Sequence, residues 1–269
     1  MTGRVVGVGL RGPVSLWPAV LLILAQICYP LTNGPARDRV TVVVVLLSAG
    51  TALSHAAAAR GTRYAVGFLA IVSGLGWAAE AVGTATGIPF GCYDYALDRL
   101  GPAVAGVPLV VPLAWTGGIY PIWVVAGLLT DRTALRIGAT ALGAVGWDLF
   151  LDPQMVADGH WHWCVTDAGL PGPAPVPYTN YLGWFAVASI MAAAVALWER
   201  TAPDRGVSVA VPVAVFLWTW LGSALAHAVF LDLPYSAAYG AAGLAVLGIP
   251  LLAGLVRRVR TGRVCTAVG

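Results

Sequence analysis

Lysine is absent from this chain, and charged residues of any kind are few. Only 10% of the 269 residues are charged, whereas 59% are hydrophobic; a soluble domain has roughly 25% charged residues. The mean hydropathy is +0.81. The arginines stand singly or in pairs between apolar runs, so the chain lacks the basic stripe of a nucleic-acid-binding protein. These absences exclude a water-soluble core and indicate an integral membrane protein.

Several motifs of soluble enzymes are also missing. The sequence has no nucleophile elbow, P-loop or dinucleotide fingerprint. Its four cysteines form no Cys-x-x-Cys pair, which argues against a zinc ribbon or a thioredoxin-type redox motif. Cys92 and Cys164 could lie on the same side of the membrane and pair, although free thiols are the simpler interpretation. No internal repeat is visible, so the inverted symmetry typical of transporters is not indicated.

Long apolar runs predict an all-α, polytopic bundle of transmembrane helices that forms one integral membrane domain over residues 1–269. A spanning helix needs about 20 mostly apolar residues. Eight segments meet this requirement: 14–32, 39–58, 64–84, 107–129, 133–151, 181–198, 207–231 and 235–256. The first is long for a signal peptide and has no clear cleavage site after it, so we interpret it as a helix.

The arginines predict the orientation of the bundle. With eight spans both termini lie on one side, and twelve of the fifteen arginines fall on that side. They are Arg4, Arg11, Arg60, Arg63, Arg132, Arg136, Arg200, Arg205, Arg257, Arg258, Arg260 and Arg263. The opposite side has Arg37, Arg39 and Arg99. Because cytoplasmic loops carry the excess of positive charge, both termini are predicted to be cytoplasmic.

Two connections on the outer side are unusual. Residues 85–106 are semi-polar, aromatic and rich in glycine and proline, and we expect an interfacial or re-entrant segment there. Residues 152–180 form the longest loop and contain a proline-rich stretch at 171–177 that is too stiff for a helix. Loops longer than about 15 residues are often lids or binding loops.

Three acidic residues stand in or at the end of apolar runs near the outer side. Asp148 and Asp152 are four residues apart, about one helical turn, so both carboxyls are predicted to share one helical face. Glu80 lies near the outer end of another span. Such residues are expensive at membrane depth and indicate a functional site inside the bundle. Two neighbouring carboxylates disfavour double ionisation, which suits paired acid and base chemistry.

Structural interpretations of these acids stay open. Asp152 precedes Pro153, so it could simply end a helix. Glu80 could be a structural carboxyl that is hydrogen-bonded between helices.

His160 and His162 alternate around Trp161 and could bring two imidazoles together. No third ligand stands at a diagnostic spacing, so no metal site is predicted.

Five sequence motifs resemble those of the integral-membrane carotenoid biosynthesis proteins, which include the carotenoid 1,2-hydratases. The motifs are Glu80-x-x-Gly83-x-x-x-Gly87-x-Pro89-Phe90-Gly91-x-Tyr93-x-Tyr95, Gly106-Val-Pro108-x-x-x-Pro112-Leu-Ala-Trp115, Trp147-Asp148-Leu-Phe-Leu-Asp152-Pro153-Gln-Met155, Gly159-x-Trp161-x-Trp163 and Pro177-x-x-Asn180-Tyr-x-Gly183-Trp184. They extend from about residue 77 to 185, roughly 40% of the chain. The flanking helices are similar only in hydropathy.

The resemblance implies a cofactor-independent hydratase in the cell membrane. Such an enzyme adds water across a terminal carbon–carbon double bond of an acyclic carotenoid and gives a tertiary alcohol. Its partners would be a lipid-soluble isoprenoid, water and membrane lipids, with no nucleic acid. Protonation of a trisubstituted olefin gives a tertiary carbocation, so the reaction needs a strong acid in a dry site. Aromatic walls would stabilise the cation.

These requirements assign expected roles. We expect Asp148 or Glu80 to be the acid, and Asp152 or Asp94 to be the base that orients water. The substrate is expected to contact the aromatic residues of the motifs and one amide: Phe90, Tyr93, Tyr95, Trp115, Trp147, Trp161, Trp163, Asn180 and Trp184. An interfacial aromatic belt is the alternative explanation for some of these aromatic residues.

Other functions remain open from the sequence. A membrane cyclase or isomerase of isoprenoids would use the same acid and aromatic walls, and only the admission of water would separate it from a hydratase. A carrier or lipid-binding membrane protein would bind without chemistry, and would keep doing so after the three acids were neutralised. A scaffold for a pathway complex is a further possibility.

Overall fold

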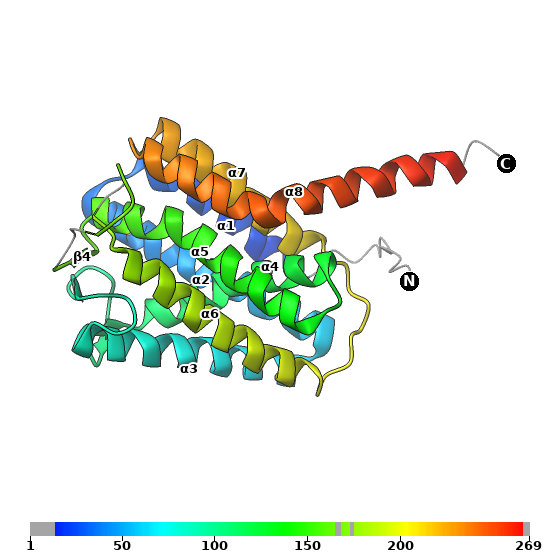
Figure 1. The fold of residues 1–269 in the computed structure, drawn as a ribbon, viewed down its shortest axis with the longest axis horizontal. Coiled ribbons are helices and arrows are strands. Elements are labelled where there is room, and N and C mark those ends of the chain that lie inside the picture. Colours follow the sequence, from blue (N-terminus) through cyan, green and yellow to red (C-terminus); the bar gives the residue numbers. More distant parts are fainter. Residues whose placement is uncertain (1–13, 165–167, 173–174, 266–269) are drawn as a thin grey trace.

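The computed structural model describes residues 14–164, 168–172 and 175–265, with side chains up to Arg257; Arg4 and Arg11 lie outside this range. The described chain forms a bundle of eight α-helices that run roughly along its long axis (Figure 1). They are α1 (Leu16–Cys28), α2 (Gly34–Arg60), α3 (Thr62–Thr86), α4 (Val110–Leu129), α5 (Thr133–Ala157), α6 (Tyr178–Glu199), α7 (Ala210–Val229) and α8 (Pro234–Cys265). The prediction of an all-α polytopic bundle is confirmed.

Seven of the described helices, α2 to α8, are long and apolar enough to cross a membrane. The first predicted span is shorter, because α1 has 13 residues and is followed only by the 3₁₀ turn η1 (Tyr29–Leu31). Pro30 lies in this turn, where its missing N–H breaks the α-helical hydrogen-bond pattern. A helix from Leu16 to Leu31 is about 24 Å long, less than the ~30 Å hydrocarbon core.

Helix α5 continues past Pro153 for a further turn, so Asp152 does not end the helix. Proline removes the hydrogen bond that the Leu149 carbonyl would accept in a regular helix. The Ser236 hydroxyl of α8 donates to this carbonyl instead, at 2.7 Å. A backbone group freed at membrane depth needs such a partner. Asp152 therefore lies within α5, one turn beyond Asp148.

Glycines allow α5 and α8 to touch backbone to backbone beside these aspartates. A Cβ atom on Gly146 would lie 2.7 Å from the carbonyl carbon of Gly243, which is too close for any side chain. Small residues commonly permit such contact between membrane helices. The contact fixes the depth and rotation of the α5 segment that carries Trp147 and Asp148.

Short strands form at one end of the bundle, and the C-terminal part of α8 projects from the opposite end (Figure 1). β1 (Tyr93–Tyr95) pairs antiparallel with β4 (Trp161–Trp163), and β2 (Ala103–Val104) pairs with β3 (Val107–Pro108). Residues 85–106, expected to form an interfacial or re-entrant segment, thus contain strands and turns. In the loop that was expected at 152–180, residues 165–167 and 173–174 lie outside the described residues.

A disulfide joins Cys92 to Cys164, directly beside the β1–β4 pair. The interpretation of these cysteines as free thiols is therefore wrong. Disulfides persist in oxidising compartments, which agrees with the outward orientation predicted for this end of the bundle. The orientation itself stays a prediction.

An ion cluster joins three helices at the opposite end of the bundle. Glu199 of α6 accepts from Arg60 of α2 at 2.5 Å and from Arg136 of α5 at 2.8 Å. The guanidinium of Arg136 also lies 3.5 Å from the ring centroid of Trp123. Each arginine is thus paired or stacked, and α5, which carries Asp148 and Asp152, is held at this end of the bundle as well.

Candidate active site

Three buried carboxyls lie at the end of the bundle that carries β1 and β4. Asp148 and Asp152 lie one turn apart on α5, and Glu80 lies near the C-terminal end of α3. Asp148 is 0% exposed, Asp152 3% and Glu80 5%. Carboxyl groups enclosed in this way need hydrogen-bond donors, and their donors come from other helices and strands.

Glu80 accepts hydrogen bonds from three side chains. The Tyr93 and Tyr95 hydroxyls donate to its Oε2 atom at 2.5 and 2.8 Å. The indole N–H of Trp115 donates to Oε1 at 3.0 Å. Burial, reinforced by the nearby Glu80 carboxyl, raises the pKa of the Tyr93 and Tyr95 phenols, so both keep their protons and can act as donors. Three donors together are suited to a carboxylate that holds its negative charge.

Asn180, near the start of α6, connects the two aspartates. Its Nδ2 atom donates to Asp148 Oδ2 at 2.8 Å and also to Asp152 Oδ2. An amide nitrogen has two hydrogens, so one side chain serves both carboxyls. The predicted common face of Asp148 and Asp152 is thus confirmed. The remaining Asp152 oxygen, Oδ1, accepts from the indole N–H of Trp161 at 3.2 Å, whereas Asp148 Oδ1 is buried without a partner among the described residues.

The β1–β4 pair places aromatic side chains over the carboxyls. Alternate residues of a strand face the same side, and Tyr93, Tyr95, Trp161 and Trp163 face inward. The rings also contact across the strands: the centroids of Tyr93 and Trp163 are 5.6 Å apart, and those of Tyr95 and Trp161 are 5.4 Å apart. We call this strand pair with its disulfide the cap.

The same alternation directs Asp94 and His162 away from the carboxyls. These two residues face each other in the register of the cap, and both are exposed. The structure therefore does not bring Asp94, one of the two expected bases, to the site. His160 is buried and its Nε2 lies 3.0 Å from Asp38 Oδ1, so the two histidines around Trp161 point to different surroundings.

Three tryptophans form an aromatic wall next to the acidic residues. The rings of Trp115 and Trp184 stack with their centroids 3.8 Å apart. Trp147 meets Trp184 edge-on at 5.5 Å. Trp115 and Trp184 belong to α4 and α6, whereas Trp147 directly precedes Asp148 on α5. All three rings line one end of the cavity, and the π face of such a ring stabilises a cation.

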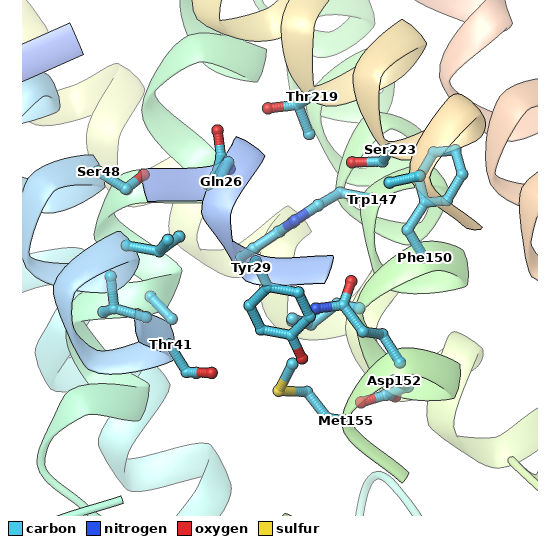
Figure 2. Close-up of a pocket in the computed structure, with 18 of the residues that line it drawn as sticks. Gln26, Tyr29, Thr41, Ser48, Trp147, Phe150, Asp152, Met155, Thr219 and Ser223 are labelled. Atoms are coloured by element: carbon cyan, nitrogen blue, oxygen red, sulfur yellow. The ribbon is translucent and has the colours of Figure 1, made fainter. Parts of the chain in front are cut away.

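A cavity of about 510 Å³ extends from this wall into the bundle. Glu80, Asp152 and Asn180 line it, whereas Asp148 is not among its lining residues. The other residues expected to contact substrate all line the cavity: Phe90, Tyr93, Tyr95, Trp115, Trp147, Trp161, Trp163 and Trp184. Figure 2 shows Asp152, Trp147 and Phe150 around this space. The cavity thus joins an acidic, aromatic end to walls that are mostly apolar.

Residues from α1 and α7 were not foreseen as part of this site. Gln26 and Tyr29 line the cavity from the α1 side, and Thr219 and Ser223 line it from α7 (Figure 2). The sequences of α1 and α7 indicate membrane helices but no site residues, because the five motifs lie between these two helices. The sequence feature that could have identified these cavity residues is a polar residue within an apolar run, such as Gln26.

Comparison with known proteins identifies the family. The family described as carotenoid biosynthesis protein matches residues 40–248, which include most of α2, all of α3 to α7 and the first part of α8. The chain belongs to this family. It is a multi-pass membrane protein of carotenoid biosynthesis, as the resemblance of its motifs suggested.

One curated relative has an assigned activity. The chain is 33% identical over 116 residues to bisanhydrobacterioruberin hydratase from Haloarcula japonica. The aligned segment covers 41% of this chain and 38% of that protein, so most of each chain lies outside the alignment. No solved structure matches the chain.

The disulfide gives a testable prediction for this carotenoid biosynthesis protein. Cys92→Ser should lower the midpoint of thermal unfolding, because the cap loses a cross-link between residues 72 apart in sequence; such links typically contribute about 2–4 kcal/mol. The fluorescence of the cap tryptophans Trp161 and Trp163 should also shift as the strands loosen. Thermal scans of the purified protein in detergent measure both effects.

Cys28→Ser is the matched control, because Cys28 is an exposed free cysteine and its replacement should leave the midpoint unchanged. Equal midpoints for Cys92→Ser, Cys28→Ser and the unmodified protein would show that the cap does not depend on the disulfide.

Proposed function

We propose that this protein is a hydratase that adds water to a terminal carbon–carbon double bond of an acyclic carotenoid, without a cofactor. The observation that carries the proposal is a carboxyl pair, with Asp152 facing the cavity, at the end of an apolar space walled by stacked tryptophans. Membership of the carotenoid biosynthesis family supports the substrate class. The relative named as a hydratase supports the reaction.

Asp152 is the proposed acid. It lines the cavity, and the Asn180 amide holds it beside Asp148. Two carboxylates around one amide in a dry site disfavour double ionisation, so the pair keeps one proton between them. Asp148, which lies behind the cavity wall, is a positioning residue that keeps this proton on the pair. Asp152 transfers it to the less substituted olefin carbon, and the olefin π electrons form the new C–H bond.

The tertiary carbocation that results needs stabilisation. The rings of Trp115, Trp147 and Trp184 line the acidic end of the cavity, and their π faces are the part that attracts a cation. Cation–π contacts are worth up to about 2 kcal/mol each when they are desolvated. In its carboxylate form Glu80 adds a negative charge near the cation, and its three donors stabilise that charge. Such preorganised charge is a main source of catalysis in enclosed sites.

Capture of water completes the reaction. A water oxygen forms a C–O bond to the cation, and one of its protons passes to Glu80, now the proposed base. Glu80 takes this role in place of Asp94, which the fold directs outward, and of Asp152, which has become the acid. Return of the proton to the aspartate pair restores the site. The net change is the addition of one water molecule.

Product mass tests the proposed reaction directly. Expression in a lycopene-producing bacterium should give carotenoids heavier by one water for each end that reacts, detected by chromatography and mass spectrometry. New pigments of unchanged mass would instead indicate cyclisation or isomerisation. An unchanged pigment profile, with the protein present in the membrane, would contradict the proposal.

Neutralising the acid should abolish hydration while substrate still binds. Asp152→Asn keeps the shape of the side chain but has no proton to transfer, and general acids typically contribute 10²–10⁴-fold to a rate. We expect hydration to fall by at least about 100-fold, measured as product formed per protein in membranes.

Asp94→Asn is the matched control on the exposed face of the cap, and should keep hydration close to that of the unmodified protein. If Asp94→Asn lost activity and Asp152→Asn kept it, the assignment of the acid would be wrong.

A further inference from the structure

Helices α1 and α7 contact each other only along part of their length. Their shared buried cluster consists of Ala19 and Leu22 of α1 with Val211 and Val215 of α7. These residues lie early in both helices, toward the end of the bundle opposite the cap. Further along, Ile27 on α1 and Leu225 on α7 line the cavity from either side.

The far ends of the two helices attach to α5 separately. The Tyr29 hydroxyl, just after α1, donates to Asp158 Oδ2, and Arg37 also binds this carboxylate at 2.6 Å. His227 of α7 lies 2.9 Å from Gln154 Oε1. Gln154 and Asp158 are four residues apart, about 6 Å along the helix axis. The last turn of α5 thus holds α1 and α7 in place without requiring that they touch.

The wall between these attachments is open to the outside. Ile27, Leu31, Leu225 and Phe230 line the cavity, yet their exposed fractions are 45, 71, 58 and 55%. By contrast, the cavity-lining residues Trp115 and Phe216 are each only 1% exposed. The four exposed side chains are large, apolar and uncharged, and they lie on α1, on α7 or directly after these helices. We call this opening the α1–α7 window.

We propose that the α1–α7 window is the lateral entrance through which the hydrocarbon chain of an acyclic isoprenoid passes from the bilayer, and in which it lies during the reaction. The inference rests on the proposed function. A carotenoid polyene is comparable in length to the ~30 Å hydrocarbon core, so a cavity of 510 Å³ holds its end group and a part of the chain. The remainder leaves through the window, with the terminal olefin beside Asp152.

Narrowing the window tests this route. In the double variant Ile27→Trp/Leu225→Trp, two larger rings should obstruct the opening while the acid and the cap stay intact. We expect the association of lycopene with the detergent-solubilised protein, followed by the change in its visible absorption band, to slow by at least tenfold. Leu182→Trp/Ile190→Trp on α6 is the matched control, because both residues are exposed and lie outside the cavity wall. The control should stay within twofold of the unmodified protein.

Widening the window gives a second, independent measurement. Ile27→Ala/Leu225→Ala should bind lycopene at least as fast as the unmodified protein, and with a smaller preference for short isoprenoids. Association rates of both window variants equal to those of the control would overturn the proposal, as would failure of the unmodified protein to bind lycopene. Binding that slows in the narrowed variant, in a protein that adds no water, would support the window and refute the hydratase.

Discussion

The hydrogen bonds to the buried carboxyls are the interactions on which the other features of this protein depend. Glu80 needs Tyr93, Tyr95 and Trp115, and the two aspartates need Asn180. Because carboxyls without donors are so unfavourable in an apolar bundle, these bonds determine how α3, α4, α5, α6 and the cap pack at this end. The cap is therefore part of the site: without its two phenols and the indole of Trp161, Glu80 and Asp152 would lose three donors.

The parts of the fold that follow from local sequence were predictable. Hydropathy located seven long helices, and spacing placed Asp148 and Asp152 on one face. Features that depend on tertiary contacts could not be predicted. Pro153 was a plausible helix end until Ser236 satisfied the carbonyl that it freed. Asp94 stood among site residues in sequence, but a strand of three residues turned it outward, and no periodicity is readable in so short a strand.

The proposed roles within the acidic cluster depend on three-dimensional placement. From the sequence we expected Asp148 or Glu80 to be the acid. In the structure Asp152 lines the cavity and Asp148 does not, so Asp152 is the acid that we propose. The disulfide was undecidable from sequence because Cys92 and Cys164 meet only when β1 pairs with β4. The contributions of α1 and α7 could not be predicted for a related reason. Their cavity residues are ordinary membrane-helix residues apart from a few hydroxyls, one amide and the imidazole of His227.

In the proposed reaction, protonation by the aspartate pair precedes capture of water. Isotope labelling tests this order. If lycopene is converted by purified protein in deuterated, ¹⁸O-labelled water, we expect one deuterium on the carbon next to the new alcohol and one ¹⁸O in that alcohol. Oxygen that derived from molecular oxygen, or a product with ¹⁸O but no deuterium at the neighbouring carbon, would contradict it.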